Sequence, residues 1–106
     1  HQKRRFPEKV DFCTSAGFLE GREQREKAGV RGGGPQAVVT NLGILQPDNT
    51  GEMILTAIHP GVQLTQVIEN TGWPLKVADE LRITEEPSDE ELRILREELD
   101  PNHIYL

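Results

Sequence analysis

Two apolar, β-branched runs joined by a short turn segment constrain this chain more than any other feature. Ala37–Leu45 is followed by Gln46–Gly51, after which Met53–Ile58 begins at once. β-Branched and apolar residues favour strands, and the Pro, Asp, Asn and Gly residues between the runs favour a reversal. The pattern predicts two antiparallel strands that form a β-hairpin. Because both runs are apolar almost throughout, we expect each strand to be covered on both faces.

The segments before the hairpin carry weaker signals. Lys9–Thr14 is short and partly apolar, so it is predicted to be a strand, with Cys13 as a buried structural thiol. Gly17–Gly34 is predicted to be a surface excursion with one or two helical turns, since its charged centre has no apolar face to dock. A connection of this length is a candidate functional loop.

After the hairpin, the pattern predicts a helix followed by a return to the sheet. Leu64–Thr71 has apolar residues at helical spacing, and Gly72 stands where a left-handed C-cap residue belongs. Trp73 is then expected to fold back on Ile68 and to fill part of the core. Pro74–Ala78 follows as a predicted strand.

The clearest helix signal lies near the C-terminus. Ser88 followed by Glu91 is the pattern of a capping box, and Pro101 ends the helix that this box begins. His103–Leu106 is an apolar tail that we expect to dock on the domain. The apolar stripe of the predicted helix is formed by Leu92, Leu95 and Leu99.

Length and charge limit the classes of protein that fit. A chain of 106 residues is long enough for one domain with one modest core. Residues 1–31 hold eight basic and five acidic side chains, whereas residues 32–106 hold four and thirteen, which gives the net charge of −6. This acidic majority argues against nucleic acid as a partner. The single cysteine allows no internal disulfide and favours a cytoplasmic setting, and the sequence contains no membrane span.

Residue chemistry alone predicts no catalytic centre and no metal site. The histidines are isolated, and neither serine nor cysteine has a nearby base in the sequence. His59, at a predicted strand end, is the best single candidate, with a half-buried histidine satisfied by backbone groups as the alternative. Gly32, Gly33 and Gly34 are a candidate glycine loop beside a ligand, with a tight turn into the strand as the alternative.

Several short runs, in order and with family-like spacing, resemble one protein family. They are Gly32–Gly43, Thr50–Met53, His59–Val62 and Glu69–Trp73, preceded by Lys3–Phe6 and Val10–Ser15. Together these runs resemble the C-terminal part of the B subunit of the family I CoA-transferases, to which the glutaconate and 3-oxoacid CoA-transferases belong. The resemblance covers about residues 1–83.

The resemblance implies an α/β fold, here a small mixed sheet with a β-hairpin and two or three helices. It also implies an enzyme in which a glutamate from the B subunit is the nucleophile toward the acyl-CoA thioester, and CoA then passes to a carboxylic acid. That glutamate belongs to a Ser-Glu-Asn-Gly type motif, which this chain does not contain. We therefore assign no catalytic residue here, and expect coenzyme A as a substrate with no permanently bound cofactor. The residues expected in a substrate-proximal loop are Gly32, Gly33, Gly34 and His59.

On this interpretation, residues 1–106 are a single α/β domain, the C-terminal fragment of a larger B subunit. The expected partners are the A subunit of a CoA-transferase and the N-terminal part of the B subunit. The isolated chain is expected to form homo-oligomers, because missing neighbours leave a strand edge unpaired. Two alternatives remain open: a relative that performs CoA-ester or ring-opening hydrolysis on the same fold, and a non-catalytic binding or assembly module. The coding sequence upstream of His1 would separate these interpretations.

Overall fold

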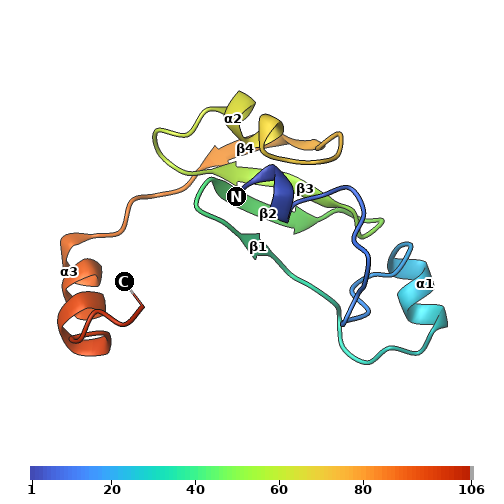
Figure 1. Ribbon diagram of the computed structural model, residues 1–106, viewed down its shortest axis with the longest axis horizontal. Helices are drawn as coiled ribbons and strands as arrows, with labels where there is room; N and C mark the ends of the chain where they lie inside the picture. The colour runs from blue at the N-terminus through green and yellow to red at the C-terminus, as the bar shows by residue number, and fades with distance from the viewer. Residues whose placement is uncertain (106) are drawn as a thin grey trace.

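A mixed four-stranded sheet forms the centre of the protein, with short helices around it (Figure 1). This computed structural model describes residues 1–105. The strands lie in the order β1-β2-β3-β4 and are β1 (Val38–Val39), β2 (Gly43–Pro47), β3 (Met53–Ile58) and β4 (Val77–Ile83). The helical elements are η1 (Lys3–Arg5), α1 (Arg22–Lys27), α2 (Leu64–Glu69), α3 (Asp89–Arg93) and η2 (Ile94–Leu99). The predicted fold class, a small mixed α/β sheet with a hairpin, is confirmed.

The predicted hairpin is present as β2 and β3, which pair antiparallel from Gly43 opposite Ile58 to Pro47 opposite Met53. Asp48 organises the turn between the two strands. Its Oδ1 accepts hydrogen bonds from the Thr50 hydroxyl at 2.7 Å and from the Thr50 amide at 2.8 Å. The side chain of Asp48 thus closes the reversal that the turn residues predict.

The prediction of one continuous strand over Ala37–Leu45 is wrong, because the chain reverses between β1 and β2. Thr40 makes this second reversal: its amide donates to the Gly43 carbonyl at 2.9 Å, and its hydroxyl accepts from the Leu42 and Gly43 amides. Gly43 is required there, since a Cβ atom would collide with the Ala57 carbonyl oxygen. Apolar periodicity gave no sign of this local side-chain bond.

The sheet changes from antiparallel to parallel pairing at β4. The chain leaves β3, passes through α2 and returns to pair parallel with β3, with Leu55 opposite Val77. The predicted strand Pro74–Ala78 starts too early and ends too soon, since β4 begins at Val77. The first hydrogen bond between β3 and this segment is donated by the Leu55 amide to the Lys76 carbonyl at 2.9 Å. Pro74 has no N–H group, so it cannot donate a hydrogen bond that would extend the pairing toward the N-terminus.

The core lies between the sheet and α2. Its buried centre is Leu42, Leu45, Leu55 and Val67. Trp73 packs half-buried against this cluster, in agreement with its predicted core role. Ile68, on which Trp73 was predicted to fold back, is 44% exposed and therefore does not lie on the buried face of α2.

Gly72 serves a different purpose from the predicted left-handed cap. Its φ angle is not positive, and its amide donates to the Phe6 carbonyl at 2.7 Å. A Cβ atom at this position would lie 2.5 Å from that same oxygen. Gly72 therefore lets the N-terminal segment, which forms a bridge at Pro7, approach the chain closely.

Residues 7–21 contain no regular strand. The predicted strand Lys9–Thr14 is absent, Phe12 is 81% exposed, and Cys13 is exposed rather than buried as predicted. A short run of strand-forming residues stays irregular without a free sheet edge beside it. The predicted surface excursion over Gly17–Gly34 is confirmed, with α1 as its helical part and Phe18 as its buried anchor.

The C-terminal helix begins as predicted. The Ser88 amide donates to Glu91 Oε2 at 2.8 Å and the Glu91 amide donates to Ser88 Oγ at 3.2 Å, which completes the capping box. The bond from the Ser88 amide, followed by a bond that the Ser88 hydroxyl donates to the same carboxylate oxygen at 3.0 Å, lowers the pKa of Glu91. The tail prediction is wrong for the residues described, because Ile104 and Tyr105 are exposed, while Leu106 lies outside the described residues.

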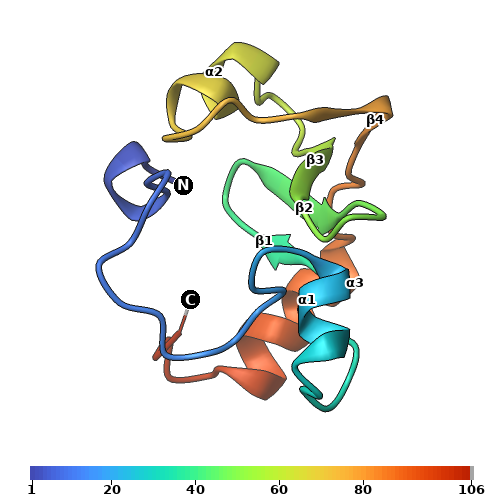
Figure 2. The ribbon, with the colours of Figure 1, turned by 90° about the vertical axis from the view of Figure 1, so that its right-hand side faces the viewer.

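Thr84 is hydrogen-bonded to the sheet, and after it residues 85–105, called the C-terminal arm below, stand away from the sheet (Figure 1). Figure 2 shows α2 toward one end of the molecule and α1 and α3 toward the other, with the sheet between them. No residue of α3 or η2 is buried. The radius of gyration is 16.4 Å, compared with about 13 Å for a compact domain of this length. Within residues 1–105, no helix is long and apolar enough to cross a membrane.

Candidate functional site at the carboxyl ends of the parallel strands

The carboxyl ends of β3 and β4 are joined by the side chain of His59. Ligands bind at this end of the strands in open α/β sheets, so the residues here are the first candidates for a site. His59 Nε2 lies 2.8 Å from the Thr40 carbonyl oxygen, and His59 Nδ1 lies 2.7 Å from the Thr84 hydroxyl oxygen. Since a carbonyl only accepts, Nε2 carries the proton, and in the neutral ring Nδ1 accepts from Thr84.

Both ring nitrogens of His59 are therefore committed to the fold. The side chain is half-buried and ties the β1–β2 turn to the end of β4. The alternative considered from the sequence, a half-buried histidine satisfied by backbone groups, fits the Thr40 bond, whereas the second partner is the side chain of Thr84. Proton transfer by this ring would require one of the two bonds to open first.

A chain of polar contacts extends from this histidine toward the N-terminal segment. His1 Nδ1 lies 3.3 Å from Thr40 Oγ1, and His1 Nε2 lies 3.0 Å from Thr71 Oγ1. The ring of His1 stacks on Phe6 with 3.9 Å between centroids. Sequence reasoning missed this cluster because its members come from five separate segments that only the fold brings together.

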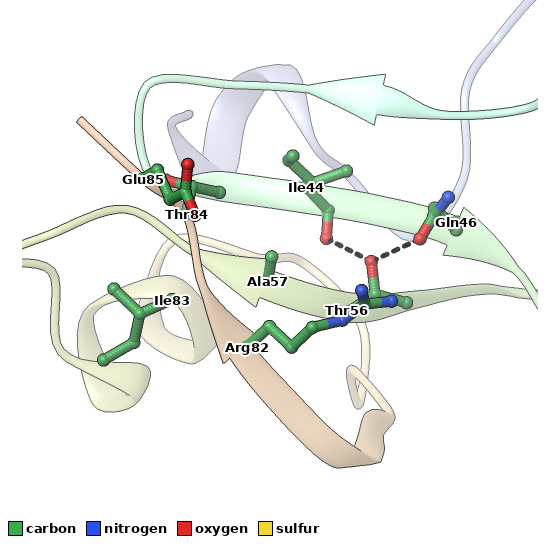
Figure 3. Close-up of a pocket in the computed structure, with 8 residues that line it drawn as sticks. All are labelled: Ile44, Gln46, Thr56, Ala57, Arg82, Ile83, Thr84 and Glu85. Carbon is green, nitrogen blue, oxygen red and sulfur yellow. Dashed lines mark hydrogen bonds between the residues drawn. The ribbon is translucent and has the colours of Figure 1, made fainter. Parts of the chain in front are cut away.

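An open groove of about 420 Å³ lies on the sheet next to Thr84 (Figure 3). Its apolar members are Ile44, Ala57 and Ile83, and its polar members are Gln46, Thr56, Arg82, Thr84 and Glu85. The Thr56 hydroxyl lies 3.2 Å from the Ile44 carbonyl oxygen and 2.9 Å from Gln46 Oε1. The groove thus offers one guanidinium, one carboxylate and several neutral polar groups around an apolar floor, a set suited to binding rather than to bond making.

The glycine loop singled out in the sequence lies beside the β2–β3 turn. Gly34 has a φ of 81°, and a Cβ atom there would lie 2.7 Å from Phe18 Cε1. Gly51, in the turn, has a φ of 96°, and its Cβ atom would lie 2.9 Å from Phe18 Cγ. Packing against Phe18 therefore explains Gly34, whereas Gly32 and Gly33 are exposed.

Two arginines of α1 hold this loop in place. The Arg22 guanidinium lies 4.7 Å above the Phe18 ring, and its Nε donates to the Asp48 carbonyl at 3.1 Å. Arg25 donates to the carbonyl oxygens of Gly17 at 2.5 Å and Arg31 at 2.7 Å. The charged helix α1 therefore also holds the glycine loop against the hairpin through these hydrogen bonds.

The structure does not bring the glycine loop and His59 together. Phe18 joins Gly34 to Gly51, which precedes β3, whereas His59 directly follows β3. A six-residue strand spans about 20 Å, so the two candidate regions lie at opposite ends of β3. Within residues 1–105, no group of three or more His, Cys, Asp or Glu side chains is placed to hold a metal ion.

Comparisons with known proteins place the chain among CoA-transferases. It is 44% identical over 94 residues to the B subunit of 3-oxoadipate CoA-transferase from Pseudomonas knackmussii, covering 88% of this chain and 36% of that protein. It is 41% identical over 108 residues to the B subunit of glutaconate CoA-transferase from Acidaminococcus fermentans, covering 100% of this chain and 40% of that protein. No family model matches the chain.

Solved structures agree with the sequence matches. The crystal structure of the Acidaminococcus fermentans glutaconate CoA-transferase superposes with a TM-score of 0.88 and 40% identity, over 98% of this chain and 40% of that chain. Rhodococcus jostii IpdAB superposes with a TM-score of 0.74 and 36% identity, over 98% and 42%. The chain spans about two fifths of the length of the relatives it matches. By sequence and by fold, it belongs to the family of CoA-transferase B subunits.

Proposed function

We propose that this chain is the C-terminal part of a CoA-transferase B subunit, in an enzyme that moves CoA between an acyl-CoA and a carboxylic acid. The observation that supports this most is the match to glutaconate CoA-transferase, 41% identical over the whole chain with a TM-score of 0.88. The names of the two transferase relatives suggest a dicarboxylic acid, of the glutaconate or 3-oxoadipate kind, as the acceptor.

The chain itself supplies structure and substrate contacts rather than the nucleophile in this proposal. The attacking glutamate lies outside these 106 residues, and coenzyme A is a substrate rather than a bound cofactor. The partners are the A subunit of the enzyme and the remaining part of the B subunit. Gly32 and Gly33 are the residues of the glycine loop that remain exposed for a ligand. His59 contributes by holding the strand ends at the edge of the open groove.

A second candidate is hydrolysis of a CoA ester or of a ring, because the chain is 35% identical to the Rhodococcus jostii cholesterol ring-cleaving hydrolase IpdB subunit. Both the identity and the TM-score of this match are lower than for the glutaconate enzyme. The transferase is therefore the better supported function.

A chimera tests the proposal. In it, this chain replaces the matching two fifths of the B subunit of the Acidaminococcus fermentans enzyme, and the product is made together with that enzyme's A subunit. We expect transfer of CoA to glutaconate or 3-oxoadipate to exceed release of CoA to water. A folded chimera that releases CoA only to water would favour the hydrolase.

The 106-residue chain alone provides the matched control. Incubated with acyl-CoA, it should form no covalent CoA adduct by mass spectrometry, because it lacks the glutamate motif. An adduct on one of its own glutamates would overturn the assignment of the nucleophile to another part of the enzyme.

A further inference from the structure

The C-terminal arm and the open groove form one continuous hollow surface. A second hollow of about 540 Å³ lies between the linker and the helix of the arm, and its members are Glu85, Glu86, Pro87, Glu91, Ile94 and Leu95. Glu85 also lines the open groove on the sheet. The two hollows therefore meet at this residue and run from the sheet onto the arm.

Three apolar side chains of the groove and the arm are exposed. Ile83, at the end of β4, is 68% exposed, and Leu99, at the end of η2, is 73% exposed. Leu95 lies between them on the arm and is also exposed. Isolated apolar residues on a surface are ordinary, but exposed apolar residues in each of two neighbouring hollows, with Leu99 further along the arm, are typical of an interaction site.

The surface is also strongly acidic. Residues 84–100 contain eight acidic and two basic side chains. One of the two basic residues, Arg93, already pairs with Glu90 and Glu98, each at 2.9 Å. A partner for this surface must therefore combine an apolar face with a basic border.

The position of the arm is shared with a relative in which more protein is present. The superposition on the glutaconate CoA-transferase covers 98% of this chain, so it includes the arm, and its TM-score is 0.88. This chain corresponds to only 40% of that chain. No residue of the arm's helices is buried here. The arm thus keeps a similar place in the relative, and about three fifths of that relative's chain lie outside the match.

We propose that the arm and the open groove together bind another segment of the B subunit, one with an apolar face and a basic border. This inference rests on the proposed function, because it takes the rest of that polypeptide as the partner. A second copy of this chain fits less well, since a two-fold contact through the arm would place one acidic surface against another.

Thiol labelling tests this proposal residue by residue. In a Cys13→Ser background, Leu99→Cys and Ile83→Cys are labelled with a maleimide in the isolated chain, at a concentration where it sediments as a monomer, and in the chimera described above. We expect labelling at both positions to slow at least tenfold in the chimera. Thr65→Cys, on the exposed side of α2, is the control and should label at similar rates in both proteins.

Three results would overturn the proposal. Equal rates at position 99 in the two proteins would mean that the arm is free in the chimera. Slow labelling at position 99 in the isolated chain that becomes faster on dilution would identify a second copy as the occupant of the arm, and slow labelling there at every concentration would mean that the arm folds onto its own sheet. If the chimera is insoluble, the isolated chain is titrated with the separately produced remainder of the Acidaminococcus fermentans protein, and slower labelling at position 99 remains the expected result.

The labelling readout is separate from catalysis. A chimera that protects positions 83 and 99 but transfers no CoA would retain the binding surface and count against the proposed function. A chimera that transfers CoA while both positions label quickly would support the proposed function and count against the binding surface.

Discussion

His59 Nδ1 and the Thr84 hydroxyl lie 2.7 Å apart, although 25 residues separate them in the sequence. Their bond joins the ends of two parallel strands, and the Thr84 amide adds a second link by donating to the Ile58 carbonyl at 2.9 Å. The other ring nitrogen of His59 reaches the Thr40 carbonyl. One side chain thus holds three segments of the sheet in register.

We expect Thr84→Val to lower the free energy of unfolding by about 1 kcal/mol, because the mutation leaves Nδ1 of a half-buried ring without its donor. His59→Ala should cost about 2 kcal/mol, since two bonds and their packing are lost. The double variant should show a coupling of about 0.5–1 kcal/mol in urea unfolding at fixed protein concentration. Thr65→Val is the matched control and should change stability by under about 0.5 kcal/mol. Strict additivity of the two mutations would argue against the bond.

The turn held by Asp48 should weaken in acid. Hydrogen bonds, above all that from the Thr50 hydroxyl, lower the pKa of the Asp48 carboxyl below its ordinary value. A lowered folded-state pKa adds stability above the unfolded-state pKa of about 3.9, and this stability is lost as the pH falls through the folded-state value. The wild-type chain should therefore exceed Asp48→Asn in stability more at pH 6 than at pH 3, measured by urea unfolding. The comparison between variants is needed because the pKa values of Glu90 and Glu91 are lowered as well. A difference that stays constant with pH would contradict this account.

Gly33 and Gly34 should respond differently to alanine. Gly34→Ala should destabilise the chain by about 1–2 kcal/mol, because its positive φ disfavours a side chain and Phe18 occupies the space. A Cβ atom at Gly33 would meet only the flexible Gln36 side chain, at 3.3 Å, so Gly33→Ala should leave stability nearly unchanged. If the loop approaches the substrate as proposed, Gly33→Ala lowers kcat/KM of the chimera without lowering its Tm. Unchanged kinetics would remove Gly33 from the substrate-proximal residues.

The isolated chain should self-associate at micromolar concentration. β4 is an edge strand of the sheet, and the apolar side chain of Ile83 at its end is uncovered. Such edges pair readily with other chains, and a symmetric dimer is the commonest closed result. Sedimentation equilibrium should show a concentration-dependent mass that Ile83→Lys reduces. A monomer at all concentrations would mean that the 106 residues close their own surface.

Features that depend on residues close together in the sequence were predictable, and features that depend on residues far apart in the sequence were not. The Ser88 capping box and the β2–β3 hairpin depend on residues a few positions apart, and both are present. Gly72 looked like a helix cap but serves the close approach of Phe6, 66 positions earlier, which no local pattern reveals. Lys9–Thr14 has the composition of a strand, but no sheet edge accepts it.

The candidate site shows the same division. His59 was identified as a residue at a strand end, and its local position is as predicted. Its partners Thr40 and Thr84 come from a turn that was predicted as strand and from the end of a strand whose bounds were predicted wrongly. The open groove was missed because it forms where β2, β3 and β4 meet. The order of strands in a sheet cannot be predicted from the sequence of any single strand.

The mixed pairing of β3 also has a consequence for the order in which the chain folds. β2 and β3 meet through the short turn at residues 48–52, whereas β4 reaches β3 only after residues 59–76 have crossed through α2. Closing the longer loop costs more chain entropy, so the hairpin should form before the parallel strand docks. Pulse-labelling hydrogen exchange during refolding should protect the amides of Gln46 and Ile54 before that of Thr84. The hydrogen bond between His59 and Thr84 would then form late, together with the docking of β4. The candidate site would therefore be completed only after the hairpin has formed.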